Sequence, residues 1–165
     1  CDAPHARAAL RDLYGQLPSS PSRRRGRPTM QSMGEFHDLD AILKLESENH
    51  FGEPADVDIT WGARRRVASQ RSIRLGSYHF EQHFIRIHPR LDHSLVPGWF
   101  VGFVVFHELL HHRLGVTMKG GRRVLHSKAF RSLEAKHPRY QDAREWELRS
   151  LPKLLRGRGR WRSRS

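Results

Sequence analysis

The sequence predicts an α+β fold in which helices pack on a small antiparallel sheet, with basic tails at both ends of the chain. Apolar residues recur at helical spacing in several stretches, and short segments alternate between apolar and polar residues as strands do. An almost wholly apolar run fills residues 95–106. Because this run is too short to cross a membrane and leads directly into His and Glu, we expect a helix buried in the centre of a domain.

Composition divides the 165 residues into three segments. Residues 1–33 are an N-terminal extension, with a predicted short helix at 2–17 and a linker rich in Pro, Ser and Arg. Residues 34–155 form the predicted domain, and residues 156–165 form an Arg-rich tail. The net charge of +13 divides as +4, +4 and +5 over these segments. Arg-rich tails suit a polyanion such as DNA, and solvated tails without a partner are the alternative.

The first half of the domain is predicted to contain one helix and three strands. Residues 34–50 place Phe36, Leu39 and Leu43 at helical spacing, and residues 57–61 alternate as a strand does.

A β-hairpin is predicted next along the chain. Residues 73–78 and 83–88 alternate in the same way, and a short polar connection joins them, which indicates an antiparallel pair. The edge of such a sheet can pair with an extended peptide.

The apolar run ends in the motif His-Glu-x-x-His at residues 107–111. Positions i and i+4 share one face of a helix, so His107 and His111 can hold one metal ion, and Glu108 can reach a water bound to it. A buried glutamate among apolar neighbours is costly unless something compensates it, as a metal would. The alternative is an amphipathic helix with histidines that face solvent.

The ends of this helix and the elements after it follow from glycine and proline. Pro97 suits a first turn and Gly115 suits a stop. Residues 116–124 are expected to form a basic loop beside the site, and helices are expected at 127–136 and 141–155. The apolar residues expected to point inwards from these two helices are Phe130, Leu133, Trp146, Leu148 and Leu151.

A catalytic zinc ion usually has three protein ligands and one open position. The downstream candidates for the third ligand are His112, His126, Glu134 and His137. His112 points about 100° away from its neighbour around the helix, so it cannot join the same site. His126 follows a glycine-containing loop long enough to return to the metal, so we prefer it, with Glu134 as the rival.

Four stretches between Ser72 and Trp146 carry a family resemblance. They are Ile-Arg-Leu-Gly-Ser-Tyr at 73–78, Ile-Arg-Ile-His-Pro at 85–89, the motif with its preceding residues at 104–111, and His-Ser-Lys-Ala-Phe at 126–130. This region, about half of the chain, resembles the SprT-like and YgjP-like zinc metallopeptidases. The resemblance implies a compact zincin-like domain with His126 as third zinc ligand. In the Spartan branch it implies DNA-dependent proteolysis of crosslinked proteins, although this chain lacks the cysteine-based zinc module of some relatives.

The expected function is a zinc-dependent metallopeptidase, with Zn²⁺ held by His107, His111 and His126 and Glu108 as general base for a metal-activated water. A protein or peptide is the expected substrate, and DNA is a further partner through the Arg-rich tails. The residues considered for stabilising the oxyanion are Tyr78, His88, His112 and Arg113, and sequence does not choose among them.

Two other functions remain open at this stage. One is a metal-dependent nucleotide phosphohydrolase whose basic residues at 119–123 hold phosphate. The other is a non-enzymatic DNA-binding module with structural zinc, although such sites often use Cys and this chain has only Cys1. A single cysteine fits a reducing compartment, so we expect a cytoplasmic protein, free or associated with the nucleoid, and no membrane partner; a lipid on Cys1 is the alternative.

Overall fold

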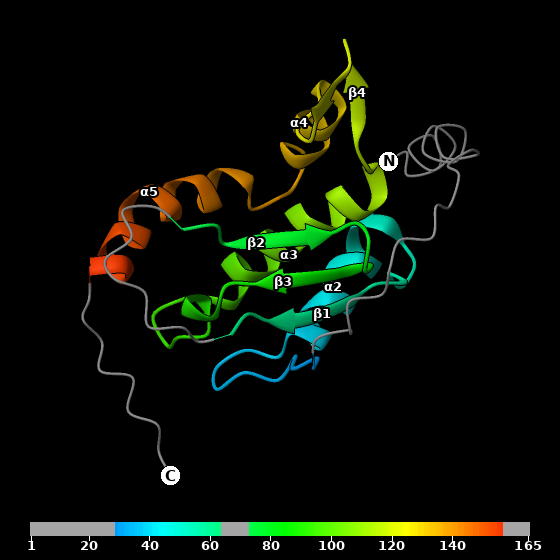
Figure 1. Cartoon of the computed structure of the whole chain (residues 1–165). Coiled ribbons are helices and arrows are strands. Elements are labelled where there is room, and N and C mark those ends of the chain that lie inside the picture. The colour runs from blue at the N-terminus through cyan, green and yellow to red at the C-terminus, as the bar shows by residue number, and fades with distance from the viewer. Residues whose placement is uncertain (1–28, 64–72, 157–165) are drawn as a thin grey trace.

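The first described helix, α2 (Leu39–Phe51), packs against the central helix α3 (Gly98–Leu114) in the computed structural model, which describes residues 29–63 and 73–156 (Figure 1). The side chain of Asp38 caps α2 by accepting the backbone N–H groups of Asp40 and Ala41. This cap starts the helix at Leu39 rather than at residue 34. Phe36 therefore precedes the helix on which it was predicted to lie, and it is 46% exposed.

Three strands form the main sheet: β1 (Asp58–Trp61), β2 (Gly76–His79) and β3 (Phe84–Ile87), in the order β1-β3-β2. β2 and β3 are antiparallel, which confirms the predicted hairpin. β1 runs parallel to β3, so the sheet is mixed. The predicted α+β class, with helices packed on a small sheet, is confirmed.

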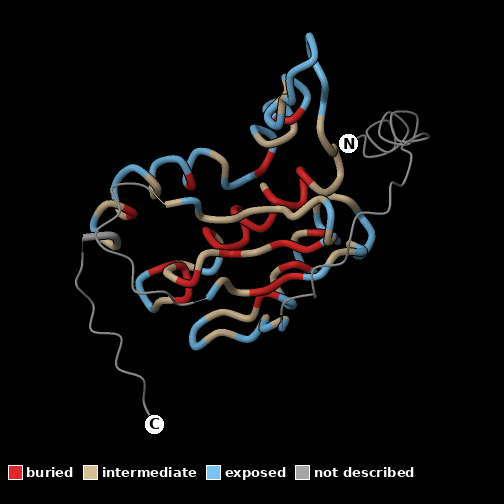
Figure 2. Tube along the Cα trace, in the orientation of Figure 1, coloured by how far each residue is buried: buried red, intermediate tan, exposed pale blue. Residues whose placement is uncertain are grey.

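Helix α3 contributes many of the buried residues of the hydrophobic core. Its apolar residues from Phe100 to Phe106 are all buried, in agreement with the prediction, whereas Leu95, ahead of the helix, is 74% exposed. Figure 2 shows the burial along α3 and β3. Pro97 is the N-cap, and Gly115, with φ of 62°, is the C-cap. A short 3-10 helix, η1 (Pro89–Leu91), precedes α3. The buried Asp92 follows η1, and its carboxylate accepts backbone N–H groups of residues 35–37, which ties the start of the domain to the core.

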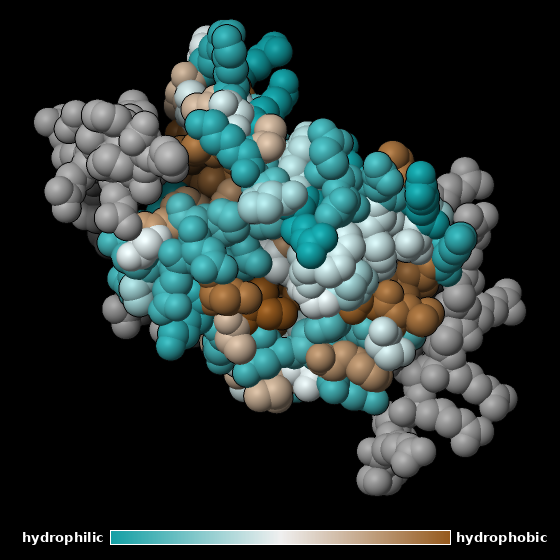
Figure 3. Space-filling model, turned by 180° about the vertical axis from the view of Figure 1, so that it is seen from behind, coloured by the Kyte–Doolittle hydropathy of each residue, from teal (hydrophilic) through white to brown (hydrophobic). Residues whose placement is uncertain are grey.

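The predicted loop after α3 is a β-hairpin. β4 (Thr117–Lys119) and β5 (Arg122–Val124) pair antiparallel across Gly120 and Gly121, whose φ angles are 57° and 74°. Two consecutive positive φ angles favour a tight hairpin turn, and glycine adopts them without strain. The hairpin projects with α4 from one end of the molecule, and this end is largely hydrophilic (Figures 1 and 3).

The last two helices are α4 (Lys128–Glu134) and α5 (Tyr140–Arg156). Three of the five predicted inward residues, Phe130, Leu133 and Trp146, belong to or pack against apolar clusters, and a fourth, Leu151, is buried. Leu148 is 78% exposed, so its predicted packing is wrong. It lies two positions from Trp146 on the helix, which places it about 200° around the axis on the outer face.

Several predictions fall on residues that the structure does not describe: the helix at 2–17, the linker and residues 157–165 of the tail. Within 29–63 and 73–156, no helix combines the length and the apolar character needed to cross a membrane.

Candidate metal centre

Three histidines from two elements converge at one end of α3. His107 and His111 lie one helical turn apart on α3, and His126 lies just before α4. The Nε2 atoms of His107 and His126 are 3.2 Å apart, and one ligand atom from each of the three residues lies within 4.8 Å of the others. The structure thus brings together the three ligands predicted from sequence in a group that could hold a metal ion.

The start of helix α4 places His126 next to α3. Ser127 caps α4 by accepting the N–H of Phe130 at 3.2 Å, which turns the chain immediately after His126. The buried ring of Phe130 then packs against all three imidazoles, with centroids 4.6–5.0 Å away. One apolar ring therefore forms the floor of the three-histidine group.

Glu134, the rival ligand, contacts His107 instead of completing the group. Its Oε1 lies 2.6 Å from Nδ1 of His107. An ionised carboxylate can only accept a hydrogen bond, so Nδ1 of His107 carries the proton and donates it. In the neutral imidazole the lone pair is then on Nε2, which faces His126. This carboxylate–histidine pair is the common arrangement behind metal-ligating histidines.

The lowered pKa values of the other two histidines also favour binding of a cation. Burial, together with the charge of His107 and His126, lowers the pKa of His111 to about 3, and the pKa of His126 is lowered by burial and by His107. Among the described residues, nothing hydrogen-bonds the buried Nδ1 of His111. Three converging imidazoles, two of them with a lowered pKa and one with an unsatisfied nitrogen, fit a divalent cation that accepts nitrogen ligands, a class that includes Zn²⁺, Cu²⁺, Fe²⁺ and Ni²⁺.

Glu108 follows His107 on α3, interacts with it electrostatically and lies under strand β2. It is 4% exposed, and burial raises its pKa to about 7 against the opposing effects of His107 and of a backbone hydrogen bond from Tyr78. Gly76 makes this position available, because a Cβ atom there would lie 2.6 Å from Oε1 of Glu108. A carboxyl group with a pKa near neutrality can both accept and return a proton.

The candidates for oxyanion stabilisation have different surroundings. His88 accepts the backbone N–H of Arg90 and caps η1, and Arg113 forms an ion pair with Glu53. The hydroxyl of Tyr78 lies 3.1 Å from Nδ1 of His112. Of these candidates, Tyr78 is the one that also contacts Glu108, through its backbone.

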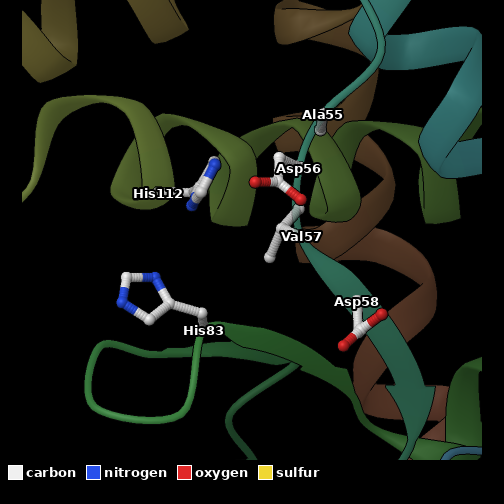
Figure 4. Close-up of a pocket in the computed structure, with 6 residues that line it drawn as sticks. All are labelled: Ala55, Asp56, Val57, Asp58, His83 and His112. Carbon is white, nitrogen blue, oxygen red and sulfur yellow. The ribbon is translucent and has the colours of Figure 1, made fainter.

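A pocket of about 750 Å³ opens beside the Tyr78–His112 pair. His112 of α3 and His83 of the β2–β3 turn line one side, and Asp56 and Asp58 line the other (Figure 4). His83 also lies 3.1 Å from the Tyr78 hydroxyl. The structure therefore assigns His112 to this pocket and not to the three-histidine group, as expected from its position on the helix.

A second group of metal-ligand side chains was not predicted from sequence. Glu46 and His50 lie one turn apart on α2, and His137 lies between α4 and α5. Oε2 of Glu46 is 3.2 Å from Nε2 of His50 and 3.3 Å from Nε2 of His137. The i, i+4 spacing of Glu46 and His50 is a local signal, but His137 joins them from 91 residues away.

Comparison of the chain with protein-family models, with curated proteins and with solved structures gives no match. The chemistry of the chain must therefore be inferred from its own residues. Two groups of side chains could hold a metal ion, one of three histidines and one of two histidines and a glutamate. The buried carboxyl of Glu108 follows His107 of the first group on α3.

Proposed function

We propose that this protein is a zinc-dependent metallopeptidase of the SprT-like type. The observation that carries the proposal is the placement of Glu108. Its buried carboxyl follows His107 on α3, interacts electrostatically with that ligand candidate and lies beneath strand β2. This combination supplies a cation site, a general base and a strand for substrate alignment within one short region.

The residues divide the chemistry between them. A Zn²⁺ ion held by His107, His111 and His126 would polarise a peptide carbonyl and acidify water. Glu108 accepts the proton that the attacking water loses and returns it to the leaving amine, so the carboxylate is restored at the end of the reaction. Glu134 holds His107 in the tautomer whose Nε2 lone pair faces the site.

Strand β2 provides a place for an extended substrate. It lies at the edge of the three-stranded sheet and packs against α3. Among the residues that the structure describes, no strand pairs with its other side. An extended peptide added to such an edge takes its register from main-chain hydrogen bonds, next to Glu108.

Proteins bound to DNA are the substrates that the charge distribution favours. The chain carries a net charge of +13. In the β4–β5 hairpin, which leads directly to His126, the side chains of Lys119, Arg122 and Arg123 are all exposed. Basic side chains near the site would attract a polyanion and raise the local concentration of proteins bound to it.

The test is proteolysis of an unfolded protein by the intact chain and by Glu108→Gln, with and without DNA. We expect Glu108→Gln to bind metal normally and to lose about 10²- to 10⁴-fold in activity, because only the proton acceptor is removed. Glu48→Gln, an exposed position on α2, is the matched control and should retain full activity. Full proteolysis by Glu108→Gln would overturn the proposal. Hydrolysis of nucleoside triphosphates in place of protein would also overturn it and would favour a phosphohydrolase.

A further inference from the structure

The second group, Glu46, His50 and His137, is connected to the three histidines through shared packing. The ring of Phe106 packs at a tilt against both His50 and His137, with ring centroids 4.7 Å away in each case. Phe106 belongs to the same apolar cluster as Phe130, which forms the floor of the three-histidine group. The two groups therefore lie against one apolar cluster.

Hydrogen bonding shows that His137 does not offer a lone pair to a cation. Its Nδ1 accepts the backbone N–H of Arg139 at 3.0 Å, so this nitrogen carries the lone pair. The proton of the neutral imidazole is then on Nε2, and it points at Oε2 of Glu46, 3.3 Å away. The side chain of His137 is only 5% exposed, so both of its ring nitrogens are satisfied within the fold without a metal.

We infer that Glu46 and His137 form a metal-free clamp that fixes the end of α4, and that both are positioning residues for the three-histidine centre. The inference rests on the metal centre of the proposed function, but not on the reaction. The clamp joins α2 to the residue three positions after Glu134, and Glu134 in turn orients His107.

Helix α4 needs such an anchor. It has seven residues, and Phe130 is its one fully buried side chain. Helices this short are marginal without tertiary contacts, and their last turns fray most easily. Glu134 is the last residue of α4, where its backbone carbonyl accepts the N–H of His137. A fixed His137 therefore keeps the last turn closed and holds Glu134 within 2.6 Å of His107.

The partner of His137 is itself rigidly held. Glu46 lies in the middle of α2, and its side chain is 12% exposed. Gly102 of α3 makes room for it, because a Cβ atom there would lie 2.5 Å from Oε1 of Glu46. The carboxylate thus spans the contact between α2 and α3 and presents its second oxygen to His137.

A double-mutant cycle on metal affinity tests the clamp, with Co²⁺ as a visible probe and the dissociation constant as the readout. Glu134→Gln should weaken Co²⁺ binding about 10- to 100-fold, as removal of a partner of a ligating histidine does. Glu46→Ala should weaken it less, roughly 3- to 10-fold, and Glu46→Gln, which keeps an acceptor for His137, should restore most of the affinity. In the double variant Glu46→Ala/Glu134→Gln, affinity should match that of Glu134→Gln alone, because both act through one contact.

His50→Gln is the matched control. His50 also contacts Glu46, but it lies on the same helix, so its loss leaves α2 and α4 joined and should leave Co²⁺ affinity within about twofold. If Glu46→Ala does not fold, His137→Gln replaces it in the cycle. Additive losses in the double variant, or an equal loss in His50→Gln, would overturn the clamp. Binding of a second Co²⁺ ion by the intact chain, lost in Glu46→Ala, would also overturn the clamp. If the intact chain takes up no Co²⁺, the proposed metal centre fails along with the clamp.

Discussion

Two groups with similar side chains and similar atom spacing flank α3, yet their chemistry differs. In one, Nε2 of His107 lies 3.2 Å from Nε2 of His126; in the other, Nε2 of His137 lies 3.3 Å from a carboxylate. The difference comes from the far side of each ring. The carboxylate that accepts from Nδ1 of His107 leaves the lone pair on Nε2, inside its group. The backbone N–H that donates to Nδ1 of His137 leaves the ring proton on Nε2, inside the second group. The second partner of a histidine thus decides whether its group suits a cation or a hydrogen bond.

The two buried carboxyl groups differ in the same way. Glu108 and Glu46 each lie against a glycine, Gly76 and Gly102, that leaves no room for a side chain. Burial dominates at Glu108 and raises its pKa to about 7. At Glu46 burial also acts to raise the pKa, but hydrogen bonds from His137 and His50 outweigh it and lower the pKa to about 2. One carboxyl can therefore exchange a proton near neutrality, and the other stays charged.

The first prediction concerns acid stability. The folded-state pKa of Glu46, about 2, is below its ordinary value of 4.5, so its charged form stabilises the fold by about 3 kcal/mol above pH 4.5. This contribution should fall away as the pH drops from about 4.5 to about 2. Urea unfolding of the metal-free chain and of Glu46→Gln should show a free-energy difference that narrows over this range. A difference that stays constant with pH would show that the hydrogen bonds to Glu46 do not depend on its charge.

The second prediction concerns the position of the Glu108 carboxyl. Gly76→Ala should displace Glu108, because the new Cβ would lie 2.6 Å from its Oε1, and a shift of about 1 Å at a catalytic group can cost about 100-fold in rate. Metal content should not change. Gly102→Ala is the matched control: it displaces Glu46 in the same manner and should leave the rate at saturating metal within severalfold. Equal rate losses in both variants would contradict the separate roles of the two carboxyl groups.

The features that depend on local spacing could be predicted from the sequence. The i, i+4 histidines, the glycine stop at Gly115 and the alternating hairpin each depend on a few consecutive residues, and the structure has all three. The position of His126 was also predicted, because a glycine-containing connection limits where the chain can return.

Features set by tertiary packing could not be predicted in this way. The parallel direction of β1 depends on a long connection, and the contact of Glu46 with His137 joins residues 91 positions apart. Glu134 was a ligand candidate because its type and distance along the chain allowed it. Its contact with Nδ1 of His107, rather than with the shared space, depends on how α4 packs against α3.

The most direct test of the contrast between the two groups is the number of metal ions per chain, measured by native mass spectrometry after Zn²⁺ loading. The intact chain should bind one ion. His111→Ala should lose it, and His137→Gln at saturating Zn²⁺ should keep it. Two ions per chain, or one ion that survives His111→Ala and is lost in His137→Gln, would contradict the assignment of the cation to His107, His111 and His126.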